Sequence, residues 1–430
     1  MRTILFVMLI ALTSIHGRGS LADFTPIVGW DQQLFPSYIF ATAAIKNSGQ
    51  QIDEMTLGDS NGLLGVQVEA TEDNIPVEVT VECDGYMEAS HYSGTLGKQG
   101  EIYSVFPKIR YRFDALGQCA QATPATVTFR VRLGTGQPEE KSTTVILRPI
   151  NDCPIIVSHG EDFIDTSFTF ATFVNEQHPF TDKLLREALD IGVVDSFTGY
   201  QSESDDEVLR QVYSVWDLMV ARDVRYSSIT TTAADSNQVF SQHVRLLEDS
   251  VNNQQANCVD GSVLLVSLLR KIGIESFLVL VPGHCYVGFY LDGEKERLLG
   301  LETTLIGAEL DWPEDVEESL EEAIDESLQS EWSWPSFVSA IRVGTSNLIE
   351  NTDKFSSSED RDYQIIDVAA ARKLGVLPIP FRSKEVFVSF DHSDYIDSAY
   401  DWDEDEDYDD EEDDEEDDEY DDEDEEDDDE

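Results

Sequence analysis

Three residues that together could form a thiol-enzyme site follow one another in a short part of the chain. Cys258 opens an apolar helical pattern, His284 follows a Pro-Gly turn, and Glu302 ends a short apolar run. A cysteine thiolate attacks carbonyl carbons, an imidazole takes up and returns protons, and a carboxylate fixes the tautomer of the imidazole. The order of these residues therefore predicts a nucleophile, its base and the group that orients the base.

The elements that must position these side chains follow from the apolar pattern. The residues after Cys258 have helical spacing, and Gly273 stands where a left-handed cap is expected. Apolar runs over 277–281, from His284 to 290 and over 298–301 have the length of strands and are separated by turn residues. We expect a helix that begins at the thiol, followed by an antiparallel sheet.

This layout suits acyl chemistry. A free thiol has a pKa of about 8.5, and a helix N-terminus with unpaired N–H groups favours the thiolate. An imidazolium at His284 would favour it further and could deliver a proton to a leaving amine. The backbone N–H of Cys258 is a natural donor to an oxyanion, and Gln254 or Gln255 could supply a second donor through its side-chain amide.

The stretch 255–306 resembles the transglutaminase-like superfamily of exported bacterial proteins, which shares its core with papain-like cysteine proteases. The resemblance rests on Cys258 at a helix start, Gly273 and Ile274 at the helix end, His284 at a strand start, and Glu302 before two threonines. The family has Asp where this chain has Glu302. The resemblance implies an α+β domain with a Cys-His-carboxylate triad. Members of the superfamily include protein crosslinkers, peptidases, amidases and forms that have lost activity.

Three other interpretations of the same residues remain open. Cys258 could be a small buried apolar residue. A disulfide between Cys258 and Cys285 is the second alternative. The third is a zinc site from Cys258, His284, Cys285 and Glu302, although no Cys-x-x-Cys or His-x-x-x-His pair accompanies them.

Residues 1–22 have the pattern of a secretory signal peptide, with Arg2 before an apolar run and a small-x-small site ending at Ala22. No other segment approaches the length of a membrane span. We therefore expect an exported protein, periplasmic or extracellular. In such a compartment disulfides can form, and one is expected among Cys83, Cys119 and Cys153; the pairing, including any role of Cys285, is left open.

The net charge of −60 is partly concentrated at the C-terminus. Residues 401–430 contain 27 acidic and no basic residues, and the remaining chain has 28 basic and 61 acidic side chains. This charge disfavours binding to nucleic acid or to an anionic membrane. A tail of this composition is predicted to be disordered. It could bind Ca²⁺ weakly, hold a basic partner or occupy the cleft, but a solvated tail is the simplest interpretation, and no cofactor is expected elsewhere.

The pattern divides the rest of the chain into two predicted domains. Residues 23–154 show the period-2 alternation of an all-β sandwich, immunoglobulin-like in its strand and turn spacing. Residues 155–390 combine helices with the predicted catalytic sheet, and the tail is placed at 391–430. Within the second domain we expect a helix with its apolar stripe over 208–220 and a capping box of Ser204 and Glu207, helical stretches over 183–189, 244–251, 314–328 and 367–375, and a last strand over 386–390.

The expected function is thiol-dependent acyl chemistry on an amide bond of a protein or peptide. Cys258 would attack, His284 would serve as base and acid, and Glu302 would orient it. Hydrolysis is favoured over crosslinking, because an exported enzyme meets abundant water and nothing in the sequence indicates an amine site. The alternative is an inactive transglutaminase-like scaffold that serves as a surface interaction or structural module.

Overall fold

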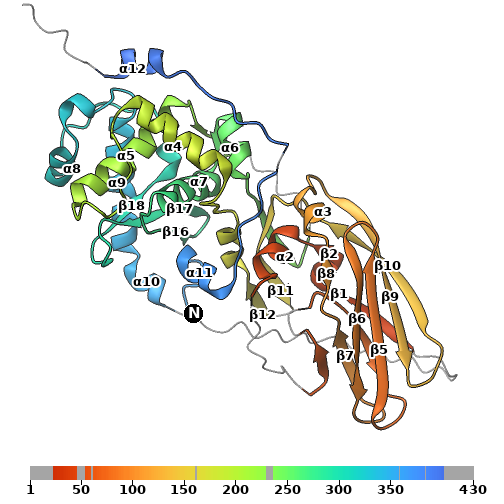
Figure 1. Cartoon of the computed structure of the whole chain (residues 1–430). Helices are drawn as coiled ribbons and strands as arrows, with labels where there is room; N and C mark the ends of the chain where they lie inside the picture. Colours follow the sequence, from red (N-terminus) through yellow and green to blue (C-terminus); the bar gives the residue numbers. More distant parts are fainter. Residues whose placement is uncertain are drawn as a thin grey trace, which may run out of the picture.

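The computed structural model describes residues 23–45, 54–59, 62–159, 162–228, 236–357, 359–382 and 384–400. The predicted signal peptide and the acidic residues 401–430 lie outside the described residues. The chain is a mixed α/β structure: β1–β10 lie together on one side, and most of the helices surround the sheet that contains β16–β18 on the other (Figure 1). None of the described helices has the length and apolar character that a membrane span needs.

Two sheets form the N-terminal part, as the alternating pattern predicts. The buried valines of β5 and the buried residues of β9 face a shared core with β4 and β7. The first sheet has the order β1 (Phe24–Val28), β4 (Leu64–Glu69), β7 (Ile102–Phe106), β3 (Thr56–Gly58). The second has the order β2 (Gln33–Leu34), β10 (Glu139–Leu147), β9 (Thr123–Leu133), β5 (Ile75–Cys83), β6 (Met87–Leu96), β8 (Arg110–Tyr111).

Two expectations for this part were wrong. It is not all-β, because it also contains α1 (Gly29–Gln32), α2 (Pro36–Thr42) and α3 (Phe113–Gly117). Pro36 begins α2, and nearly the whole helix is buried, so no amphipathic period reveals it. The expected disulfide is also absent, since all five cysteines are free. The thiols of Cys83, Cys119 and Cys153 each donate to a nearby backbone carbonyl instead.

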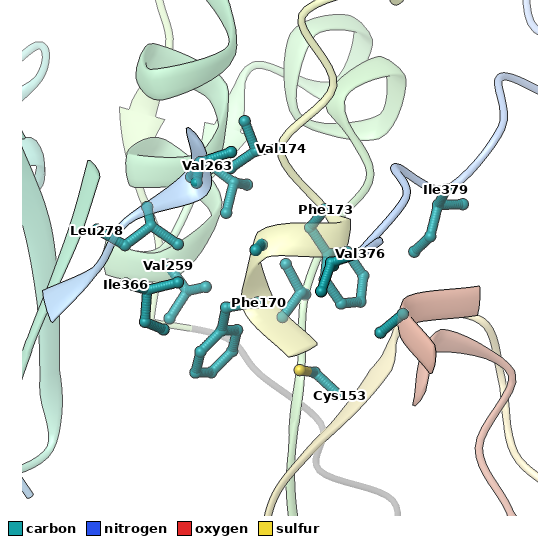
Figure 2. Packing of buried hydrophobic residues seen from close by; sticks show 14 of the residues in the cluster. Cys153, Phe170, Phe173, Val174, Val259, Val263, Leu278, Ile366, Val376 and Ile379 are labelled. Atoms are coloured by element: carbon teal, nitrogen blue, oxygen red, sulfur yellow. The ribbon is translucent and has the colours of Figure 1, made fainter. Parts of the chain in front are cut away.

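A small three-stranded sheet connects this part to the helices. Its order is β12 (Asp162–Asp165), β11 (Asp152–His159), β14 (Val239–His243), and both pairs are antiparallel. The predicted domain boundary at residue 154 falls within β11. After β12, the 3-10 helix η1 (Ser167–Thr172) brings Phe170 between Val259 and Cys153 (Figure 2).

The predicted catalytic helix and sheet are confirmed as elements. α7 (Cys258–Lys271) ends at Gly273, which has a φ of 86°, and it packs on β16 (Ser276–Val281) and β17 (His284–Tyr290). The sheet has the order β18, β17, β16, β19 and is antiparallel throughout. Its outer strands are β18 (Leu298–Leu301) and β19 (Gln364–Ile366).

The remaining elements surround this core. They are α4 (Pro179–Ile191), α5 (Asp205–Ala221), β13 (Arg225–Tyr226), α6 (Leu247–Asn253), β15 (Gln255–Ala256), η2 (Thr303–Leu305), α8 (Glu318–Ala323), η3 (Glu326–Leu328), α9 (Trp334–Glu350), α10 (Thr352–Ser356), α11 (Val368–Leu374) and α12 (Ser393–Ala399). Of the capping box predicted at α5, only the bond from the Glu207 N–H to the Ser204 hydroxyl forms. The Glu207 carboxylate pairs with Arg210 instead.

α9 lies unusually close to β18. A Cβ on Gly300 would fall 2.2 Å from the backbone carbon of Gly344, so two glycines are needed where the helix crosses the strand. The close approach lets the carbonyl of Ala340 accept a hydrogen bond from the N–H of Glu302 at 3.0 Å. The backbone of Glu302 is therefore held by α9 as well as by its own strand.

Residues 376–382 and 384–400 form a strap from α11 past α6 and α4 to α12 (Figure 1). The strand predicted over 386–390 is wrong: the segment is extended but has no neighbouring strand, and the side-chain amide of Asn252 bonds the backbone of Val386 and Val388 instead. The tail predicted from 391 also begins too early, because Tyr395 and Tyr400 donate to the buried carboxylate of Asp217, both at 2.6 Å.

Candidate active site

α7 begins at the thiol because its first turn is capped from two sides. The side chain of Asn257 accepts hydrogen bonds from the N–H groups of Val259 and Asp260, and the Asp260 carboxylate accepts from the N–H of Asn257. This is a complete capping box. Arg245 forms a salt bridge to Asp260 at 2.6 Å, so this side chain supports the helix start. Among the described residues, the N–H of Cys258 has no hydrogen-bond partner.

The structure brings His284 and Glu302 together. Nε2 of His284 lies 2.7 Å from Oε2 of Glu302. The other carboxylate oxygen, Oε1, accepts from the N–H and the hydroxyl of Thr304, at 3.0 and 2.7 Å. Glu302 is buried and held through both oxygens, and the ring of His284 stacks on Tyr286. The hydrogen bond with Glu302 and the stacking on Tyr286 thus orient the imidazole of His284.

Cys258 interacts with the same imidazole and lines the same cleft. A hydrogen bond with Cys258 and a hydrogen bond with Glu302 together outweigh burial and raise the pKa of His284 to about 10. Burial disfavours ionised Glu302, but its hydrogen bonds with His284 and Thr304 lower the pKa of this carboxyl below its ordinary value. Both effects favour an imidazolium beside a carboxylate.

We expect this arrangement to be visible in the titration of His284. The pKa rises from 6.5 to about 10 on folding, so the stabilisation by the imidazolium is fully present below pH 6.5 and is lost as the pH rises through about 10. NMR of ¹³C-histidine-labelled protein should show protonated His284 at pH 8. In a Cys258→Ala variant the titration should move to lower pH. A wild-type ring that titrates near 6.5 would contradict the predicted coupling.

One of the two predicted oxyanion donors is already engaged elsewhere. Gln254 caps α6 with a φ of 54°, and its Nε2 donates to the carbonyl of Arg222 at 2.7 Å, so this amide is already occupied. The side chain of Gln255 is exposed on β15. The backbone of Gln254 is in the left-handed conformation, which the sequence alone does not reveal.

Tyr226 is a residue that sequence reasoning missed. β13 pairs in parallel with β15 and places Tyr226 opposite Ala256, two residues before the thiol. Partial burial and the charges of Cys258 and Glu302 raise the pKa of its phenol, which keeps the O–H available as a donor. No motif marks this residue, since its position depends on the pairing of two short strands far apart in the chain.

Cys285 lies behind the nucleophile. Its thiol is buried, and burial and the nearby Cys258 raise its pKa, while a hydrogen bond with Ser262 opposes the shift. Cys258 and Cys285 are both free, so the disulfide considered as an alternative is not formed. The described residues also contain no group of three or more His, Cys, Asp or Glu side chains arranged to hold a metal ion.

A cleft of about 550 Å³ opens above Cys258 and His284. One side is formed by the small sheet and η1, and the other by the β16–β17 turn and the segment before β19. The lining residues are Ile155, Ile156, Phe163, Asp165, Ser167, Phe170, Gln242, Cys258, Val259, Leu280, Val281, Pro282, Gly283, His284, Cys285, Arg361, Asp362 and Gln364. A reacting carbonyl in this cleft could therefore meet the thiol and the imidazole together.

No family model matches this chain, and no curated protein matches it. Among solved structures, the chain is similar to one from Cytophaga hutchinsonii named "Putative Cysteine Protease". The two sequences are 11% identical, and the match covers 55% of this chain and 73% of the other with a TM-score of 0.20. A similarity at this level establishes neither the fold nor the function of this chain.

Proposed function

We propose that this protein is an exported thiol-dependent hydrolase of peptide or protein amide bonds, built on a transglutaminase-like scaffold. The observation that carries the proposal is the imidazole of His284, which has Glu302 2.7 Å from its Nε2 and interacts with Cys258 in the same cleft. A thiol, an imidazole and a buried carboxylate in this order match the roles of nucleophile, base and orienting group.

The reaction would proceed through an acyl-thioester. The Cys258 thiolate adds to the carbonyl carbon, and the N–H of Cys258 and the O–H of Tyr226 are the proposed donors to the oxyanion. The C–N bond breaks as the His284 imidazolium gives its proton to the leaving amine. His284 then takes a proton from water, the hydroxide attacks the thioester, and the thiolate leaves as the acid is released.

Alkylation of the native protein with iodoacetamide between pH 5 and 9 tests this proposal. At pH 6.5 we expect mass spectrometry to show Cys258 labelled at least about tenfold faster in the wild type than in His284→Ala, because a thiol without its imidazolium is mostly protonated. Cys285 is the internal control: its burial and raised pKa should leave it unlabelled until the protein is unfolded.

Equal labelling rates in wild type and His284→Ala would contradict the proposal, and would favour the inactive scaffold that serves as an interaction module. A fast, His284-dependent reaction would be followed by hydrolysis assays with quenched fluorescent peptides. Release of the new carboxylate without transfer to an added amine would support hydrolysis over crosslinking.

A further inference from the structure

We infer that the cleft binds its substrate through an apolar shelf, which is formed by the side chains of Ile156, Phe163 and Phe240. The shelf receives a bulky apolar side chain of a basic peptide. The inference rests on the proposed function, because it names the substrate class of the same site. It goes beyond the triad, since none of the three shelf residues takes part in the chemistry.

The strand register places the shelf residues on one face of the small sheet. Ile156 of β11 is paired with Asp165 of β12 and with Phe240 of β14, and Ser158 is paired with Phe163. Residues directly opposite each other share a face, and alternate residues of one strand do so as well. Ile156, Phe163 and Asp165 line the cleft with Cys258, so this face is directed toward the site.

The two faces of the small sheet differ sharply in burial. Phe163 and Phe240 are 55% and 56% exposed, while Val157 and Val239 on the opposite face are 3% and 1% exposed. The sheet therefore packs its aliphatic face into the core and leaves its aromatic face open beside the thiol. Exposed apolar side chains gathered beside a cleft are a feature of ligand-binding surfaces.

The polar side chains beside the shelf already have hydrogen-bond partners within the protein. Asp165 accepts from the N–H and hydroxyl of Ser167 at 2.9 and 2.6 Å, and from Nε2 of Gln364 at 2.7 Å. The hydroxyl of Ser167 also donates to Gln364. This network ties the two sides of the cleft together and leaves the apolar rings as the main contact surface. A large apolar side chain is the group that such a surface stabilises.

Charge selects among the peptides that carry such a side chain. The charged side chains of the cleft lining are the carboxylates of Asp165 and Asp362, the guanidinium of Arg361 and the imidazolium of His284, so the lining itself is close to balanced. Asp162 is exposed next to Phe163, and the chain as a whole is strongly acidic. Long-range attraction therefore favours a basic peptide. The acidic residues 401–430 are a poor occupant for the same reason, because their charge has the sign of the rest of the chain.

Peptide binding to a full-length Cys258→Ala variant tests the shelf without requiring any chemistry. Fluorescein-labelled peptides with Lys-Phe, Lys-Ala and Glu-Phe at their centre would be compared by fluorescence polarisation. We expect the Lys-Phe peptide to bind at least about tenfold more tightly than the Lys-Ala peptide, which is the low end for burial of one large apolar side chain. It should also bind more tightly than the Glu-Phe peptide at low salt, with a difference that shrinks at high salt.

In the same background, Phe163→Ser combined with Phe240→Ser should bring the Lys-Phe to Lys-Ala ratio close to one. Ile349→Ser, at a position on α9 that is 70% exposed, is the matched control and should leave the ratio unchanged. A wild-type ratio near one, or a ratio that survives the double substitution, would overturn the shelf. Failure of the proposed function is read separately, by the alkylation of Cys258 in the wild-type protein.

Discussion

Replacing Glu302 by alanine is expected to reduce amide hydrolysis by roughly 10³–10⁴-fold, the effect of removing the orienting carboxylate of a catalytic triad. Glu302 accepts from His284 through one oxygen and from Thr304 through the other. Its removal leaves the imidazole free to rotate and removes the negative charge that stabilises the imidazolium. The measurement is kcat/KM on a quenched peptide, together with the rate of Cys258 alkylation at pH 6.5.

Two further variants separate orientation from general damage. Glu302→Gln retains an oxygen for the Thr304 N–H but loses the charge, so alkylation at pH 6.5 should still slow. Glu309→Ala removes a carboxylate from an exposed position shortly after η2 and should change neither rate. If Glu302→Gln matched the wild type in both assays, Glu302 would be structural, and the proposed triad would reduce to a Cys-His pair.

Local pattern was enough to predict the elements that carry the candidate triad. α7 has apolar residues at helical spacing and a glycine at its end, and the turn before His284 contains Pro282 and Gly283, so short-range preferences agree with the fold. His284 and Glu302 meet because adjacent strands β17 and β18 are joined by a short connection. In such a case the order along the chain already implies proximity.

The surroundings of the triad could not be predicted in this way. The small sheet that lines the cleft joins β11 and β12 to β14, which follows only after α4 and α5, and pairing across such a distance leaves no local signal. Tyr226 is placed near Cys258 by the pairing of β13 with β15, and each of these strands has only two residues. Gln254 was misplaced because its left-handed backbone conformation, rare for a residue with a side chain, changes the direction of the chain.

The strap shows a second kind of limit. Its residues were divided between a strand and a disordered tail, because 386–390 is a strand-like run and acidic residues accumulate toward the C-terminus. What orders the strap is a series of buried polar contacts with helices that precede it by more than a hundred residues. Arg382 bonds Glu248, His392 bonds Glu187, and Tyr395 bonds Asp217.

A further buried contact of the strap leads to the second large prediction, that Arg222→Ala lowers the free energy of unfolding by roughly 3–5 kcal/mol, as expected when one partner of a buried ion pair is removed. Arg222 is 0% exposed and pairs with Glu187. Its guanidinium lies 5.0 and 4.5 Å from the ring centres of Phe387 and Phe390, and it donates to the carbonyl of Val388. Urea unfolding at pH 7 measures the loss.

The comparison that decides whether burial is the cause is Arg186→Ala, which breaks an exposed pair with Asp190 and should cost less than about 1 kcal/mol. Acid provides a second test. Burial would raise the pKa of Glu187, but hydrogen bonds with His392 and Arg222 lower it below 4.5, so its stabilisation is present above pH 4.5 and is lost as the pH falls through the lower folded value. Arg222→Ala should weaken that acid-dependent loss. If Arg222→Ala instead cost no more than Arg186→Ala, the ion pair would contribute nothing net, and the strap would be held by its other contacts.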